Sequence, residues 1–123
     1  MNQHRLHFMD VTDYGNGIVE AIVDDGVDVS ALQLRELIDL LNGLPGQPPC
    51  LLINRINHYS LKFEMFYEVP RNKVIKRITI VNHGKHNQFI PSKLWPKNLP
   101  VSFFNDYDSG MQWLETHIGS LSQ

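Results

Sequence analysis

The stretch from Cys50 to Val69 constrains the fold of this chain most strongly. It begins with an apolar run, Cys50–Ile53, passes through a polar segment, Asn57–Ser60, and continues as an amphipathic run, Leu61–Val69. A short apolar run bounded by polar residues predicts a buried strand, and a serine directly before an amphipathic run predicts a helix N-cap. The stretch therefore predicts a strand, a loop and a helix capped by Ser60. In open α/β sheets, ligands and regulators act at the loops beyond the carboxyl ends of the strands.

Two segments before this stretch also have clear patterns. The β-rich runs Arg5–Met9 and Ile18–Val23 flank a cluster of Gly, Asn and Asp residues, which predicts a β-hairpin. A helix with Ser30 as its N-cap follows, because four apolar residues recur at helical spacing: Leu34, Leu37, Ile38 and Leu41. Gly43 stands where a C′ glycine is expected, so the helix should end there.

The remaining elements follow Val69. A β-branched run at Lys76–Val81 predicts a strand, Lys85–Trp95 predicts a helix or an irregular segment, and Pro100–Phe104 predicts a last short strand. Asp106 or Asp108 can cap a final helix, whose apolar side would be Met111, Trp113, Leu114, His117 and Ile118. This order predicts an α/β fold: a mixed, mostly parallel five-stranded sheet with an N-terminal β-hairpin at its edge, covered by about four helices.

Length and composition indicate an ordinary globular protein. The 123 residues suffice for a single domain, 1–123, with one core, and the 42% hydrophobic content excludes disordered and fibrous classes. No apolar run is long enough to span a membrane and no charged leader precedes an apolar segment, so we expect a cytoplasmic protein that does not cross a membrane. The one cysteine, Cys50, should be a small buried hydrophobe.

The net charge of −2 is unevenly distributed. The segment Arg71–Lys97 contains seven basic residues and no acidic one, so the rest of the chain is acidic. The start of this segment provides a candidate anion-contacting surface, formed by Arg71, Lys73, Lys76 and Arg77. The alternative is an ordinary solvated surface at a strand edge. We do not expect nucleic acid as a partner, because the total charge is acidic and no helix-turn-helix, zinc-finger or aromatic RNA-binding pattern is present.

The order of elements, with a serine opening the helix after the third strand, resembles the STAS fold of anti-sigma-factor antagonists. More narrowly, the chain looks like the SpoIIAA-like branch, whose members are small stand-alone bacterial proteins. The resemblance covers about Tyr14 to Ile118. Three pieces carry it: Leu51–Tyr67, the basic strand Lys76–Val81 with the tryptophan segment after it, and the last strand leading into Met111–Leu114.

This resemblance implies a regulatory role for Ser60. In regulatory STAS proteins, a partner kinase phosphorylates the serine at this position. The surrounding pattern in the family is Asp, any residue, Ser, Gly, whereas this chain has His58-Tyr59-Ser60-Leu61. From the residues alone Ser60 is an N-cap, a role worth roughly 1 kcal/mol. The two roles are compatible, because a phosphate at a helix N-terminus is well placed electrostatically.

The helix expected over Leu61–Val69 has a wider apolar arc than packing against a sheet requires. Together with the preceding loop it gives a candidate interaction or ligand surface: Asn57, His58, Tyr59, Leu61, Phe63, Met65, Phe66 and Tyr67. Such a surface fits an unidentified protein partner, a second copy in a homodimer, or the wall of a pocket for an apolar small molecule. The alternative is a helix that is buried on all sides within one core.

These patterns favour a non-catalytic regulatory or protein-interaction module over an enzyme. The second hypothesis is a carrier or sensor of a small apolar or amphipathic, lipid-like ligand beneath Leu61–Val69. A hydrolase using His58 and Ser60 would need a carboxylate beside His58 and an open cleft. His83 and His86 have a spacing that suits a shared metal but lack a third ligand, so we expect neither a metal nor another cofactor.

Overall fold

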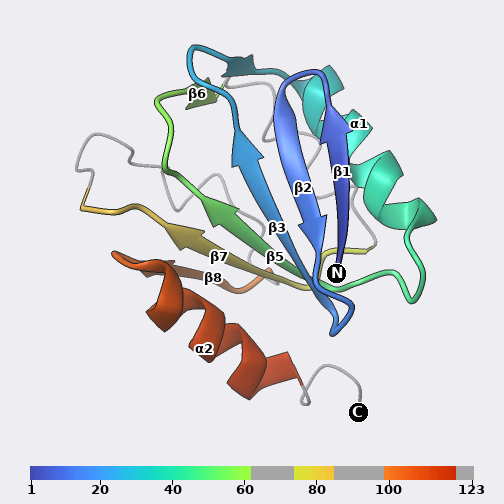
Figure 1. Ribbon diagram of the computed structural model, residues 1–123, viewed down its shortest axis with the longest axis vertical. Coiled ribbons are helices and arrows are strands. Elements are labelled where there is room, and N and C mark those ends of the chain that lie inside the picture. Colours follow the sequence, from blue (N-terminus) through green and yellow to red (C-terminus); the bar gives the residue numbers. More distant parts are fainter. Residues whose placement is uncertain (62–73, 85–98, 119–123) are drawn as a thin grey trace.

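The computed structural model describes residues 1–61, 74–84 and 99–118. Six strands of these residues form one sheet in the order β1-β2-β3-β5-β7-β8 (Figure 1). Their bounds are β1 Asn2–Leu6, β2 Met9–Asp13, β3 Ile18–Val23, β5 Cys50–Asn54, β7 Arg77–Val81 and β8 Val101–Phe104. The first three strands pair antiparallel and the others pair parallel, which confirms a mixed α/β sheet with an antiparallel hairpin at its N-terminal edge.

The prediction of five strands is wrong: the sheet has six within the described residues, because the run Arg5–Met9 is divided between β1 and β2. Leu6 and Met9 pair across a tight turn. Phe8 and Met9 are consecutive, yet both are buried in the same cluster, at 4% and 3% exposure. A continuous strand would point them to opposite faces, so the turn is what lets both side chains enter the core.

A second, very small sheet lies beyond the carboxyl ends of β3 and β5. It consists of β4 (Asp28–Val29) and β6 (Ser60–Leu61), which pair parallel to each other. Figure 1 shows this pair above the main sheet, joined to it by the segments that leave β3 and β5. The pair connects two loops at the edge where α/β sheets usually carry their sites.

Helix α1 (Ala31–Gly43) begins as predicted. Ser30 forms a capping box with Gln33, in which each side chain bonds the backbone N–H of the other. The predicted C′ role of Gly43 is wrong, because Gly43 is still helical and Leu44 ends the helix in an extended conformation. Leu44 is buried at 7% exposure, so the chain leaves the helix in the direction that brings this side chain into the core.

The two helices of the described residues cover opposite faces of the sheet (Figure 1). Alternate residues of β5 show this: Leu51 packs with α1 side chains, whereas Cys50 and Leu52 pack on the side of α2 (Tyr107–His117). Helix α2 starts at the predicted cap Asp106, whose carboxylate accepts a bond from the Ser109 N–H. Its predicted apolar side is confirmed, with Leu114 fully buried.

Gly110 lets α2 approach the sheet closely. A Cβ at this position would stand 3.0 Å from methyl carbons of both Thr79 and Val81 on β7. A methyl group here would require the Thr79 and Val81 side chains to move, so the missing side chain of Gly110 permits the close approach of α2 to the sheet.

The helices predicted over Leu61–Val69 and Lys85–Trp95 fall mostly outside the described residues. Leu61 is described, and it belongs to β6 and not to a helix. Among the described residues, no helix combines the length and apolar content needed to cross a membrane.

Candidate functional site

The loop after β5 is held to the β3–β4 connection by a row of hydrogen bonds, which we call the seam. It joins residues 23–29 to residues 57–61. Three hydrogen bonds of the seam precede the β4–β6 ladder: Asn57 Nδ2 to the Val23 carbonyl (3.0 Å), His58 N to Asp25 Oδ1 (2.7 Å) and Gly26 N to the His58 carbonyl (2.7 Å). The seam therefore fixes the loop through backbone and side-chain groups together.

Ser60 lies at the end of the seam. It pairs in register with Asp28, its N–H donates to the Val27 carbonyl at 2.9 Å, and its Oγ donates to Asp28 Oδ1 at 2.9 Å. Ser60 and Asp28 are both exposed. The predicted N-cap role of Ser60 is wrong at this position, because a capping hydroxyl accepts a bond from the first helical turn, whereas this hydroxyl donates to a strand residue and Leu61 is itself in a strand.

The other loop residues divide into buried and exposed. Tyr59 is only 8% exposed and its ring lies 4.7 Å from the guanidinium carbon of Arg55. Burial raises the pKa of Tyr59 and lowers that of Arg55. Asn57 is committed to the Val23 carbonyl. His58 and Ser60 are thus the predicted loop residues that are exposed to a partner.

The structure does not bring His58 and Ser60 together as a nucleophilic pair. The hydroxyl proton of Ser60 is directed to Asp28, and the backbone of His58 is the part that meets the Asp25 carboxylate. A base must reach the nucleophile directly to activate it. These bonds tie the loop to the β3–β4 connection.

Most of the remaining predicted surface lies outside the described residues: Phe63, Met65, Phe66, Tyr67, Arg71 and Lys73. The small-molecule carrier hypothesis depends on this part of the chain. Of the candidate anion contacts, Lys76 is exposed, whereas Arg77 is partly buried with its guanidinium carbon 5.1 Å from the Trp113 ring. The structure thus gives the side chain of Arg77 a packing role on α2.

The structure contains a buried network of hydrogen-bonded polar side chains that the sequence patterns did not predict. It runs from the surface into the sheet and back to α2 through five side chains: His83, Asn54, Glu20, Tyr14 and Tyr107. Glu20 and Asn54 are only 7% and 8% exposed. The available signal was a single polar residue within or ending an otherwise apolar strand, since Glu20 lies inside the run Ile18–Val23.

The hydrogen bonds of this network all donate in the direction of Glu20. Both Glu20 carboxylate oxygens accept, from Tyr14 OH at 2.5 Å and from Asn54 Nδ2 at 2.7 Å. Asn54 Oδ1 must then accept from His83 Nε2 at 2.5 Å, and Tyr14 must accept from Tyr107 at 2.9 Å. The network therefore assigns the proton of His83 to Nε2 and directs every donor toward Glu20.

His83 is the surface-exposed end of this hydrogen-bond network and lies just beyond the carboxyl end of β7. It has a left-handed backbone with φ of 54°, which non-glycine residues adopt uncommonly. Nearby Asp106 has a lowered pKa, first because Ser109 donates backbone and side-chain bonds to it and also because His83 lies close. The hydrogen-bond network thus holds the exposed imidazole of His83 in one orientation beside the start of α2.

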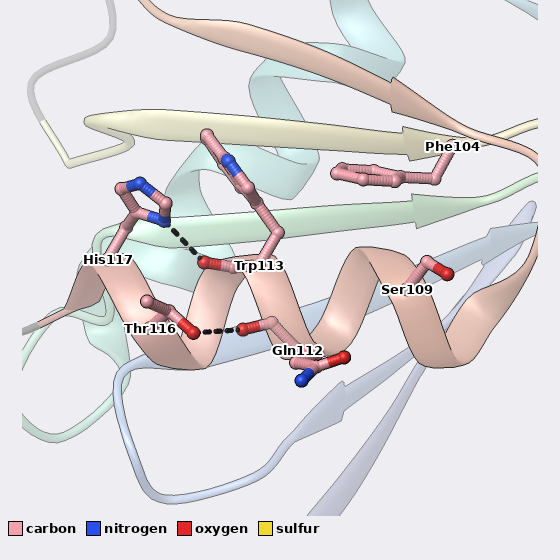
Figure 2. A pocket seen from close by; sticks show the side chains of 6 residues that line it. All are labelled: Phe104, Ser109, Gln112, Trp113, Thr116 and His117. Atoms are coloured by element: carbon pink, nitrogen blue, oxygen red, sulfur yellow. Dashed lines mark hydrogen bonds between the residues drawn. The ribbon is translucent and has the colours of Figure 1, made fainter.

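An open hollow of about 340 Å³ lies on α2 beside β8 (Figure 2). It is lined by Phe104, Ser109, Gln112, Trp113, Thr116 and His117. The Trp113 ring is 4.5 Å from the His117 ring and 5.1 Å from the Arg77 guanidinium carbon, so much of its surface is already in contact within the protein. Figure 2 shows His117 and Thr116 bonded to backbone carbonyls of their own helix, which leaves the hollow few directed polar groups.

Comparison with known proteins gives no relative: no family model, no curated protein and no solved structure matches the chain. The function is therefore inferred from the geometry of the site. The seam lies beyond the carboxyl ends of the parallel strands β3 and β5 and carries the exposed hydroxyl of Ser60.

Proposed function

We propose that this chain is a non-catalytic regulatory or protein-interaction module of the SpoIIAA-like STAS type, and that its state is set at Ser60. One observation carries the proposal: the exposed Ser60 hydroxyl donates to the Asp28 carboxylate across the β4–β6 ladder. A modification at this hydroxyl would act directly on the bonds that shape the loop.

Asp28 supports the resemblance to STAS proteins, although the residues directly before Ser60 do not match the family pattern. The family pattern places an aspartate two residues before the serine, where this chain has His58. The tertiary structure brings a carboxylate to Ser60 from a distant segment, 2.9 Å from its Oγ. This carboxylate beside the Ser60 hydroxyl supports the proposed likeness to the family serine.

The interaction surface would be the exposed part of the same loop. Ile56 is 50% exposed, although it is a large apolar residue, and His58 and Ser60 are exposed beside it. An apolar anchor surrounded by polar groups is typical of the centre of a protein-binding patch. This exposed apolar side chain among exposed polar groups favours a protein partner over a small substrate.

The experiment compares capture of partner proteins by the wild type, Ser60→Ala and Ser60→Asp from an extract of the native cells. Ser109 provides matched controls, Ser109→Ala and Ser109→Asp, because its exposed Oγ also donates to an aspartate, Asp106, at 2.9 Å. We expect the Ser60 variants to change the amount of at least one captured protein, and the Ser109 variants to leave it unchanged. Identical capture by all forms, with native circular dichroism spectra, would remove the regulatory role of Ser60.

A further inference from the structure

We infer that phosphorylation of Ser60 opens the seam between residues 24–28 and 57–60. The inference rests on the proposed function and concerns how the modified site changes shape. In the covalent step, Ser60 Oγ attacks the terminal phosphorus of a nucleoside triphosphate. The Oγ–P bond forms, the bond from phosphorus to the diphosphate leaving group breaks, and the hydroxyl proton passes to a base of the partner kinase.

The step removes the donor that closes the ladder. In the free hydroxyl, Ser60 Oγ donates its proton to Asp28 Oδ1 at 2.9 Å. The phosphoester oxygen carries no proton, so the Ser60 oxygen and the Asp28 carboxylate are then both hydrogen-bond acceptors. The bond is therefore lost for chemical reasons, before any effect of charge is considered.

Charge acts in the same direction. A phosphoserine carries a charge of about −1.5 to −2 at pH 7. It would stand opposite Asp28, its register partner, and near Asp25, whose carboxylate accepts the His58 N–H within the same seam. Two described arginines near this edge are already engaged, since Arg5 bonds Asp24 and Asp10 and Arg55 lies on the Tyr59 ring. Like charges on the two sides of the seam favour separation.

The seam is small enough to open locally. β4 and β6 have two residues each, and the bonds that precede them lie at the exposed edge of the protein. On either side, Val29 is 4% exposed and Tyr59 is 8% exposed, and both belong to the core on the α1 face. These two side chains should stay in place, so the opening is confined to the exposed hydrogen bonds around them, those of Gly26, His58 and Ser60.

An opened seam changes what the loop presents to a partner. His58 and Ile56 are positioned by the bonds from Asn57 to Val23, from His58 to Asp25 and from Gly26 to His58. When these bonds are released, the exposed side chains lose their fixed positions. Modification at one hydroxyl therefore alters the shape of the binding surface, in addition to its charge.

The test is amide hydrogen exchange on the full chain with phosphoserine inserted at position 60 during translation. The reporters are the N–H groups of Gly26 and Ser60, which donate across the seam at 2.7 and 2.9 Å. We expect both to exchange about tenfold faster than in the unmodified protein, with Leu52 on β5 and Ile80 on β7 unchanged. Unchanged exchange at Gly26 and Ser60, or an equal increase at Leu52 and Ile80, would overturn the inference.

Two further variants identify the cause. Phosphoserine at position 109, opposite Asp106, adds the same charge to α2 and should leave Gly26 and Ser60 exchange unchanged. Asp28→Asn in the chain with phosphoserine at position 60 removes the opposing charge, adds a donor, and should slow exchange again. No slowing in that variant would contradict the proposed cause. A capture pattern that ignores Ser60 would refute the proposed function while leaving this exchange result unaffected, so the two failures are distinguishable.

Discussion

The hydroxyl of Tyr14 donates a hydrogen bond of 2.5 Å to the carboxylate of Glu20, which is buried at 7% exposure. Glu20 lies on the α2 face of β3, between apolar neighbours. Because Tyr14 also accepts from Tyr107 in the first turn of α2, this one hydroxyl connects the helix to a buried anion in the sheet.

Tyr14→Phe should destabilise the protein by about 1–3 kcal/mol, because it leaves a buried carboxylate oxygen without its donor. The free energy of unfolding from urea denaturation measures this change. Tyr107→Phe is the matched control, since it removes only the outer hydroxyl, and its effect should be smaller. Equal losses in the two variants would contradict the direction of donation that we assign.

The same bond predicts a loss of stability at alkaline pH. Burial, followed by the bond to Glu20, raises the pKa of Tyr14 above its ordinary value of 10.0. A raised pKa in the folded state gives stability that is complete below pH 10 and is lost as the pH rises through the raised value. The stability difference between the wild type and Tyr14→Phe should therefore shrink above about pH 10. Denaturation at a series of alkaline pH values checks this, and a constant difference would argue against it.

Asn54 should fix the tautomer of His83. Asn54 Nδ2 is committed to Glu20, so its Oδ1 accepts from His83 Nε2. Nitrogen-15 NMR of the imidazole should show the Nε2–H tautomer for neutral His83 in the wild type. Asn54→Leu removes the acceptor and should give a mixture of tautomers. His58, whose backbone and not its ring is held in the seam, serves as the internal reference and should not change.

Gly110→Ala should destabilise the protein by about 1–3 kcal/mol, because its methyl group would meet two side chains at 3.0 Å. Gly43→Ala is the control, since nothing lies within 4 Å of a Cβ at that helical position. Alanine has the higher helix propensity, so Gly43→Ala should be neutral or slightly stabilising. Thermal unfolding of both variants decides the matter, and similar effects would show that close packing at Gly110 is unimportant.

Local patterns predicted much of the fold. Two strands, Ile18–Val23 and Cys50–Asn54, and two N-caps, Ser30 and Asp106 (one of two predicted alternatives), depend on neighbours only a few residues apart. Each was found within about a residue of its expected place. The predictions failed where distant segments decide the conformation. Phe8 and Met9 lie at a turn through which both side chains enter the core, and Ser60 belongs to a strand because its segment pairs with the distant β4.

The candidate sites divide in the same way. Ser60 stands out in the sequence as a serine before an amphipathic run, but its actual partner is 32 residues away in the chain. The pairings of the polar network from His83 to Tyr107 have no local signature, because its members come from five separate elements and turns. Only the single polar residue Glu20 within an apolar strand indicates that something buried must satisfy it.

The sequence by itself determined the alternation of strands and helices, the faces that are apolar and the caps that start two helices, since these depend on short-range periodicity and local hydrogen bonds. The tertiary structure alone decided the partners of the polar groups. A hydroxyl or carboxylate bonds whatever group the fold brings within about 3 Å. For that reason Ser60 faces Asp28 and Glu20 faces Tyr14, although nothing in the neighbouring residues of either pair predicts the contact.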